Sequence, residues 1–474
     1  MSHSKKNIIK IMSMLATSSV LVMIINIVKL KIIAITLGPE GVGLLGMLTL
    51  LVTVSAIVFG LGLQMSGIQL LGENKKEEKQ EQYEIKFAAL IVTITLSLIV
   101  SSVIFIFSNE IEISFSGHFE NRYLIVLLAS AIVMTLFSNL SYMYLQSDRR
   151  VKDIAKVKVL GTLSSGVVTI VIVFLVPNAS IIPYIIVLLP MANLIITLLI
   201  IKEDIVNFSR VKISKSKKYV KLLVASGFVL MLSSALTNSS QFFVRYLLTT
   251  EFSATKLGLY QAAWSISMTY VGFVISAMST DFFPKITECA NEKDKSNFLV
   301  NEQIDVALCI IAPFLIILFV GAPYIVNVLY TKEFILTDKI LQWQSIGDVF
   351  KVISYPLGFL LLANRNSIRF FSAVLIWNIL YIGFIYIYSN SMGIVVTGKA
   401  YLFAYVIYTI YMFLEVRRLH GFNLSQFSKK YATFILGSLL VIAIVSNYSE
   451  VVMYAVSLVI LSSAIYFAIM KIKS

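Results

Sequence analysis

Residues 24–45 read IINIVKLKIIAITLGPEGVGLL and contain the end of one apolar run, a Gly-Pro pair and the start of a second apolar run. This pattern predicts two membrane-spanning helices joined by a tight turn at Gly38 and Pro39. Lys31 lies seven positions before Gly38, roughly 10 Å from the helix end at the rise of an α-helix. A cation at that depth costs about 2.5–3.5 kcal/mol in lipid, so we expect polar groups around Lys31.

The same arrangement recurs further along the chain, where residues 239–259 read SSQFFVRYLLTTEFSATKLGL. Arg245 takes the place of Lys31, at a separation of 214 positions. Two further pairs of predicted helix ends share a separation of 216 positions: Leu145 with Leu361, and Ile201 with Arg417. This spacing predicts two copies of one unit of about 215 residues, with a transported ligand between them near the paired cations.

The composition excludes a soluble globular protein. Of the 474 residues, 58% are hydrophobic and 14% are charged, which is typical of a multi-span membrane protein. The formal net charge of +14 would suit a nucleic-acid ligand, but most of the cations fall in short predicted loops, as the positive-inside rule requires. We therefore expect membrane lipids, and no nucleic acid, as partners.

Apolar runs of spanning length predict an all-α integral membrane protein with about 14 transmembrane helices. The runs occupy residues 9–37, 42–71, 85–107, 122–146, 155–176, 178–201, 219–249, 257–283, 303–330, 339–363, 368–389, 393–415, 430–447 and 450–470. An even number of spans in each copy predicts two parallel-related six-helix lobes around a central cavity, followed by two extra C-terminal helices. The predicted parts are an N-terminal lobe (1–201), a basic cytoplasmic inter-lobe loop (202–218), a C-terminal lobe (219–418) and spans 13 and 14 (419–474).

The distribution of Lys and Arg orients the chain. With the N-terminus in the cytoplasm, the cytoplasmic segments hold 30 of the 39 cations and the outer segments hold 4. Both termini are therefore predicted to be cytoplasmic. For the basic loop 202–218, a solvated linker is the commoner use of such a segment, and a site for anionic headgroups or an acidic ligand is the alternative.

Charges inside the spans are candidate functional residues, because intramembrane charge is costly. We predict that Lys31 and Arg245 share a role in the substrate cavity, with snorkelling to the headgroups as the alternative. Lys29 lies two positions from Lys31, about 200° around the helix, so both cannot face one cavity. Lys29 is therefore left to a helix contact or to snorkelling.

The tenth span carries an acid and a base on one face. Asp348 and Lys351 are at positions i and i+3, which permits an ion pair within the helix. Asp348 is equally a candidate coupling residue for protons or sodium, with Lys351 as a cavity cation. Gln342 and Gln344 in the same span could contact sugar hydroxyls, but hydrogen bonding between helices is the commoner use of such residues.

No catalytic or cofactor site is predicted. The short loops could assemble no paired carboxylates and no Ser-His-Asp or Cys-His arrangement, and the two cysteines and three histidines form no metal-ligand cluster. The segment GIVVTGKA imitates a phosphate-binding loop, but Ala400 follows Lys399 where Ser or Thr is required, and no strand precedes it. We expect Lys399 to add to the cavity charge, and we expect a transporter without a cofactor.

Three stretches resemble a known family. They are GPEGVGLLGMLTLL (38–51), TDFFPKITE (280–288) and LQWQSIGDVFKVISYPLGFLLLANRNSIRF (341–370). The chain is similar over nearly its whole length to the O-antigen flippases (Wzx type), close to the enterobacterial common antigen flippase pattern, within the multidrug/oligosaccharidyl-lipid/polysaccharide exporter superfamily. Some relatives carry an acid in the eighth span, where this chain has Met268.

This resemblance implies translocation of an undecaprenyl-diphosphate-linked oligosaccharide, an O-antigen repeat unit, to the outer leaflet of the bacterial inner membrane. The mechanism that it implies is alternating access. We expect coupling to a gradient of protons or sodium, with uncoupled flipping as the alternative, and a monomer. A polysaccharide polymerase and a chain-length regulator are further candidate partners. Lys31, Arg245, Asp348 and Lys351 are the matching positions. A surplus of Lys and Arg in the cavity would attract the anionic diphosphate.

Two other classes of function are weighed. A multidrug or cation antiporter of the same superfamily should have a cavity rich in acids, whereas intramembrane cations outnumber acids here. A membrane polysaccharide polymerase or an acyltransferase would require a catalytic outer loop or a buried cluster of His or acids, and the predicted outer loops are short. The sequence therefore favours the flippase.

Overall fold

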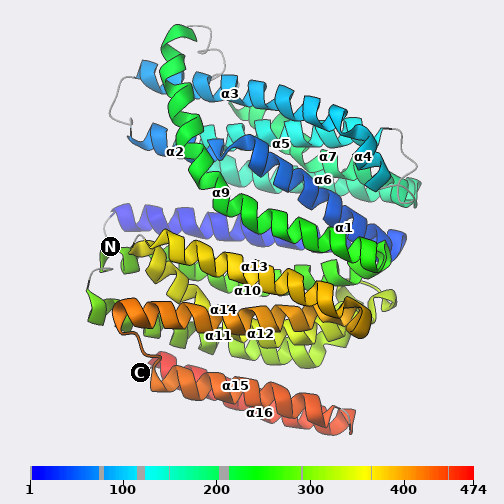
Figure 1. Cartoon of the computed structure of the whole chain (residues 1–474), viewed down its shortest axis with the longest axis vertical. Helices are drawn as coiled ribbons and strands as arrows, with labels where there is room; N and C mark the ends of the chain where they lie inside the picture. Colours follow the sequence, from blue (N-terminus) through cyan, green and yellow to red (C-terminus); the bar gives the residue numbers. More distant parts are fainter. Residues whose placement is uncertain are drawn as a thin grey trace. The chain divides into compact units, whose positions relative to one another are not determined.

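The computed structural model describes residues 3–73, 79–114, 123–148, 150–201, 213–289, 292–364, 366–446 and 448–473. The described residues form helices, turns and short connections, and no strand (Figure 1). The chain is thus an all-α protein, as predicted. It divides into two compact units, residues 1–246 and 247–474. Of the predicted inter-lobe loop, residues 202–212 lie outside the described residues, and residues 213–218 begin a helix.

The first unit is built from the helices before Leu247. They are α1 (His3–Gly60), α2 (Leu63–Glu73), α3 (Lys79–Ile106), α4 (Ser108–Ser114), α5 (Leu124–Ser147), α6 (Val151–Leu175), the short 3-10 helix η1 (Ala179–Ile181), α7 (Ile182–Ile200) and most of α9 (Ile213–Glu251).

The second unit continues with long helices. They are α10 (Ala254–Glu288), α11 (Lys293–Leu329), η3 (Lys332–Phe334), α12 (Thr337–Ala363), α13 (Ser367–Met392), η4 (Gly393–Val395), α14 (Val396–His420), α15 (Gln426–Val445) and α16 (Glu450–Lys473). Apart from the run 42–71, which is discussed below, every apolar run predicted as a span coincides with helical structure of the two units.

The predicted turn at Gly38 is a sharp break inside α1. Gly38 has φ 62° and ψ −166°, a backbone conformation that is strained for residues with a Cβ. Pro39 follows, and its fixed φ suits the first turn of the next helix. The two residues therefore end one helical segment and start another, which is the role predicted from the sequence.

The first unit contains four elements, α3, α6, η1 and α7, that have counterparts in the second unit at a nearly constant separation. The helices α3 and α11 begin 214 positions apart, and so do η1 and η4, and α7 and α14. The helices α6 and α13 begin 216 positions apart. These helix starts therefore support the repeat predicted from the sequence.

A turn in each unit repeats in its hydrogen bonds. The Arg150 amide donates to the Leu145 carbonyl at 2.8 Å, and the Asn366 amide donates to the Leu361 carbonyl at 2.9 Å. Donors and acceptors are both 216 positions apart. The same short connection therefore joins α5 to α6 and α12 to α13, which is expected of two copies of one structural unit.

The continuous span predicted at 42–71 is wrong in one respect, because the helix is interrupted. Here α1 ends at Gly60 and α2 begins at Leu63, with Leu61 at φ 47° and Gly62 at φ 63°. Gly227 of α9 packs against this break, and a Cβ on Gly62 would lie 2.3 Å from the Gly227 carbonyl oxygen. The corresponding helix of the second unit, α10, runs from Ala254 to Glu288 without a break.

The core of the first unit includes α3 and α5, together with residues of α2, α6 and α9. Ile85, Ala88 and Met143 are fully buried there. Lys86 is also buried, and its ammonium group pairs with Asp148 at 2.7 Å. A buried cation is tolerated only with such a partner, so this pair fixes the end of α5 against α3.

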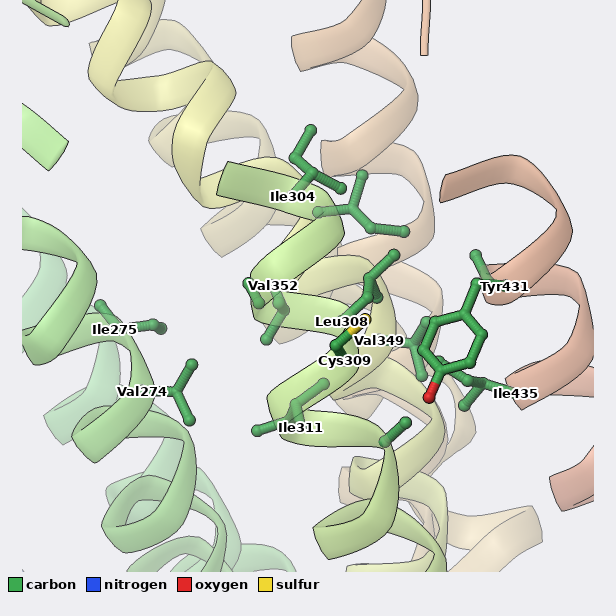
Figure 2. Close-up of a cluster of buried hydrophobic side chains, with 14 of the residues drawn as sticks. Val274, Ile275, Ile304, Leu308, Cys309, Ile311, Val349, Val352, Tyr431 and Ile435 are labelled. Carbon is green, nitrogen blue, oxygen red and sulfur yellow. The ribbon is translucent and has the colours of Figure 1, made fainter. Parts of the chain in front are cut away.

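The core of the second unit is a larger apolar cluster (Figure 2). Figure 2 shows Leu308 and Ile311 of α11, Val352 of α12 and Tyr431 of α15 within it. A polar contact holds the two last helices in place. Buried Asp305 of α11 accepts hydrogen bonds from two serines at the start of α15, and it pairs with Lys471 of α16 at 3.1 Å.

Large apolar side chains also cover the outside of both units. Leu175 is 76% exposed, Leu199 is 73% exposed and Val451 is 77% exposed. Several helices are long and apolar enough to cross a bilayer. Because water would not stabilise so much exposed apolar surface, these faces contact lipid, and the chain is a multi-pass membrane protein.

Candidate functional site

The buried carboxylate of Asp348 is the centre of a polar cluster in the second unit. Tyr401 of α14 donates a hydrogen bond to its Oδ1 at 2.7 Å. Ser267 of α10 donates to its Oδ2 at 3.1 Å, and the Tyr270 hydroxyl of the same helix also donates to Oδ2. Asp348 is fully buried, so these three hydroxyl groups replace its hydration.

Lys351 reaches Asp348 through a tyrosine. Its ammonium group donates to the Tyr401 hydroxyl oxygen at 3.3 Å and contacts the Met268 sulfur at 3.4 Å. It also lies over the rings of Tyr401 and Tyr405, at 5.8 Å and 5.6 Å from their centroids. The ion pair predicted within α12 thus takes the form of a relay, Lys351 to Tyr401 to Asp348.

Small residues allow this relay to form. A Cβ on Gly347 would lie 2.6 Å from the Tyr401 ring, and a Cβ on Gly398 would lie 2.7 Å from the Ile340 carbonyl oxygen. The two glycines therefore let α12 and α14 approach closely, which is how membrane helices commonly pack. That approach brings the Tyr401 hydroxyl to Asp348.

The hydrogen-bond directions determine which charge state the cluster suits. Because the Tyr401 oxygen accepts from Lys351, its own proton is directed at Asp348. All three hydroxyl groups donate to the carboxylate, which suits the ionised form because that form has acceptor sites only. A proton on Asp348 would add a donor to a cluster of donors and would weaken the hydrogen bonds that Asp348 accepts from α10 and α14.

Aromatic rings enclose the cluster. The Tyr401 ring contacts Trp264 of α10, Trp377 and Tyr381 of α13 and Tyr405 of α14, with centroid separations between 4.6 Å and 6.5 Å. Rings of this size exclude water and fix the position of the hydroxyl group. The buried polar cluster is therefore held in one arrangement by apolar packing.

The other polar residues of this region have separate contacts. Lys399 is half-buried, with its ammonium group 5.6 Å from the centroid of the Trp343 ring. Gln342 donates to the Phe319 carbonyl of α11 at 3.1 Å, which is the predicted use between helices. Gln344 is fully buried, and neither end of its amide group has a partner among the described residues.

The two paired cations of the sequence both belong to the first unit. Arg245 of α9 is 4% exposed and donates from Nη1 to the Gln241 carbonyl at 3.0 Å and to its side-chain oxygen at 3.3 Å. Lys31 and Lys29 of α1 are both half-buried. Snorkelling does not account for this buried guanidinium, because the charged end of a snorkelling side chain reaches water.

Sequence reasoning did not find the three hydroxyl groups around Asp348. Ser267 and Tyr270 lie in the segment SISMTY, which has Met268 where some relatives carry an acid, and Tyr401 lies 53 positions after Asp348. The sequence feature that could have identified these hydroxyl groups is the polar face of α10, opposite the intramembrane acid. The acid of this site comes from α12, and α10 supplies its hydrogen-bond donors.

The sequence matches a known protein family. The profile of the family described as "Polysaccharide biosynthesis protein" matches residues 32–337, which is more than half of the chain. Among curated proteins, the "Lipid III flippase" of Escherichia coli (strain K12) is 21% identical over 387 residues, covering 80% of this chain and 90% of that protein. The protein of the same name from Shigella flexneri matches equally.

Solved structures confirm the fold. A structure titled "Lipid II flippase MurJ, inward closed conformation" superposes with a TM-score of 0.72 at 15% identity, covering 95% of this chain and 97% of the other. An inward-facing multidrug resistance MATE family transporter of the MOP superfamily gives 0.69 at 13% identity, covering 84% and 94%. At these identities the likeness concerns the fold alone.

Proposed function

Because the chain belongs to the family of polysaccharide biosynthesis proteins, we propose that it is a flippase for a lipid-linked oligosaccharide. The substrate is an undecaprenyl-diphosphate-linked O-antigen repeat unit, which moves from the cytoplasmic to the periplasmic leaflet of the inner membrane by alternating access. Both termini lie in the cytoplasm. The name of the curated relatives, "Lipid III flippase", supports a lipid-linked substrate.

The observation that carries the proposal is the buried guanidinium of Arg245 within a membrane helix. Burying a cation is costly unless its function requires it, and an Arg can give two parallel hydrogen bonds to a phosphate. Lys31, at the corresponding position of the repeat, adds a second cation. A diphosphate is the part of the proposed substrate that needs such groups, whereas the undecaprenyl chain can remain in lipid.

The relay in the second unit is the proposed coupling site. Asp348 is held by donors from α10 and α14, so its charge state affects the packing of three helices. Uptake of a proton or a sodium ion at this carboxylate would therefore change the contacts of α12 and bias the conformation of the unit. Lys351 and Lys399 supply further positive charge.

The arrangement of Asp348 argues against a drug antiporter. A carboxylate that binds cationic drugs needs hydrogen-bonding capacity for the drug, whereas Asp348 already accepts hydrogen bonds from three hydroxyl groups of the protein, one of which also accepts from the Lys351 ammonium. Its role in this arrangement is internal. A flippase for an anionic lipid headgroup makes use of the cations instead.

The test is a leaflet-resolved assay of undecaprenyl-diphosphate-linked repeat units in a strain that lacks the gene. The wild-type gene should clear units from the cytoplasmic leaflet, and Arg245→Ala and Lys31→Ala should lower that rate at least tenfold at equal expression. Lys29→Ala is the matched control, because Lys29 is half-buried in the same helix but faces another direction.

Two results would contradict the proposal. If the strain without the gene places its units in the outer leaflet normally, another protein performs the flipping. If Arg245→Ala and Lys31→Ala clear the units as fast as Lys29→Ala, the two cations are not part of the substrate path. Drug resistance on overexpression, without any effect on the units, would favour the antiporter.

A further inference from the structure

The interruption between α1 and α2 borders a cavity inside the first unit. The cavity has a volume of about 260 Å³ and lies among α1, α2, α3, α5 and α9. A single water requires only about 10–15 Å³ of such space, and pockets for drug-sized ligands usually exceed about 300 Å³. The cavity is therefore suited to a ligand of the size of one sugar ring.

The broken helix adds backbone polarity to this cavity. A helix that ends leaves its last four carbonyl groups without partners inside the helix. Ile57 and Gly60 belong to the last turn of α1, and both line the cavity. Gly62 lies at the break itself, also on the cavity lining. In transporters, discontinuous membrane helices commonly mark a binding site, because unpaired backbone groups are tolerated there.

The side chains that line the cavity are polar without being charged. They are Gln64, Thr93, Asn139, Ser234 and Asn238, from four different helices. Among the described residues of the lining, none carries a charge. Amide and hydroxyl groups in this number, alternating with Leu and Met, suit a neutral ligand with many hydroxyl groups and an apolar ring face.

Asn139 is the residue that most clearly lacks a partner. Its amide group makes no hydrogen bond with any other described residue, although it is half-buried in α5. Thr93 donates its hydroxyl proton to the Ala89 carbonyl at 2.9 Å, so its oxygen can still accept. Asn238 donates to the Ser234 carbonyl at 2.8 Å, and its side-chain oxygen likewise remains an acceptor. The cavity thus offers one complete amide group and several acceptors.

We propose that this cavity binds one neutral or N-acetylated sugar residue, and, on the proposed function, that this is a sugar of the lipid-linked oligosaccharide. A monovalent cation is the competing ligand. It would need far less space, and a carboxylate ligand would favour it, whereas the lining holds none among its described residues. The cavity therefore recognises the sugar portion, and the buried cations recognise the diphosphate.

A binding experiment tests the site independently of transport. Saturation-transfer NMR with the purified full-length protein would measure binding of methyl glycosides of neutral and N-acetylated hexoses. Asn139→Leu should weaken binding of the preferred glycoside at least fivefold, which is the effect of about one net hydrogen bond. Thr93→Val should weaken it in the same direction, because it removes a cavity acceptor at constant shape.

Thr95→Val is the matched control. Thr95 lies in the same helix as Thr93 and bonds its own helix in the same way, at 3.0 Å to the Ile91 carbonyl, but it is exposed and does not line the cavity. Its variant should bind as wild type does. Equal melting temperatures of the three variants would show that the loss of binding is not a loss of folding.

The outcomes separate this inference from the proposed function. Glycoside binding that depends on Asn139, in a protein whose deletion leaves leaflet distribution unchanged, would support the site and contradict the flippase. Flipping by a protein that binds no glycoside, or whose Asn139→Leu variant binds as wild type does, would overturn the site and leave the flippase intact. Binding of sodium instead of glycosides would also overturn the proposed sugar site.

Discussion

Removing the hydroxyl group of Tyr401 should destabilise the second unit more than any other single-atom change among its buried tyrosines. This oxygen accepts from the Lys351 ammonium at 3.3 Å and donates to the Asp348 carboxylate at 2.7 Å. Tyr401→Phe keeps the ring and its aromatic contacts, and it removes only the atom that connects the two charges.

The expected loss of unfolding free energy in Tyr401→Phe follows from the two lost hydrogen bonds. A hydrogen bond to a charged group contributes about 1.5–3 kcal/mol, so the two together contribute at most about 3–6 kcal/mol. Asp348 retains Ser267 and Tyr270, and Lys351 retains the Met268 sulfur, so we expect a loss near the lower end, about 3 kcal/mol.

Tyr381→Phe is the control for this change. Tyr381 is fully buried beside Tyr401, and its hydroxyl donates at 3.4 Å to the neutral Tyr260 hydroxyl. Loss of a long bond between neutral groups should cost no more than about 1 kcal/mol. At about 2–4 °C per kcal/mol for a unit of this size, the melting temperature should fall by about 6–12 °C in Tyr401→Phe and by less than about 4 °C in Tyr381→Phe.

The assay is thermal unfolding of the purified variants in one detergent, measured at the same scan rate. Equal melting temperatures for Tyr401→Phe and Tyr381→Phe would refute the reasoning, because the relay would then contribute nothing beyond ordinary packing. A crystal or cryo-electron microscopy structure of Tyr401→Phe should show Lys351 displaced toward Asp348.

Three further changes should have measurable effects on the melting temperature. Asp348→Asn leaves Lys351 buried without its counter-charge and should be more destabilising than the double variant Asp348→Asn/Lys351→Met; additive losses would contradict this. Gly62→Ala should cost more than about 2 kcal/mol, from its positive φ and from the Gly227 carbonyl 2.3 Å away, whereas Gly72→Ala, with nothing within 4 Å, should be neutral or stabilising. Asp305→Asn weakens the attachment of α16 and should cost about 1–3 kcal/mol; an unchanged melting temperature would mean that apolar packing alone holds the last helices.

The helices could be predicted from the sequence because their signals are local. Apolar runs of spanning length define the segments, and residues such as Gly38 and Pro39 end and start helices through their own backbone preferences. The repeat was visible for the same reason, since each copy needs its turns at the same places. The predicted runs and the helices of the structure therefore coincide within a few residues at most ends.

The interruption at Leu61 and Gly62 could not be predicted, because its packing partner is distant in the sequence. The apolar pattern continues through both residues, and the break packs against the backbone of Gly227, 165 positions after Gly62. Glycine at position 60 and at position 62 was the only local indication, and isolated glycines are common in membrane helices.

The candidate site was predicted in part. Asp348 and Lys351 were identifiable because charge inside an apolar run is costly in itself. Their partners were not, since contact between Asp348 and Tyr401 depends on how closely α12 and α14 pack, which Gly347 and Gly398 determine. Residue type can indicate that a buried charge needs partners, but packing decides which residues they are.

The central claim is translocation of a lipid-linked oligosaccharide, and reconstitution tests it most directly. Purified protein would be placed in liposomes that contain an undecaprenyl-diphosphate-linked oligosaccharide, and the fraction of headgroups open to an added glycosidase would be followed in time. The account predicts that wild-type protein exposes headgroups from the inner leaflet and that Arg245→Ala does so at least tenfold more slowly. A cleaved fraction that stays at the value of protein-free liposomes, with correctly folded protein and an imposed ion gradient, would contradict it.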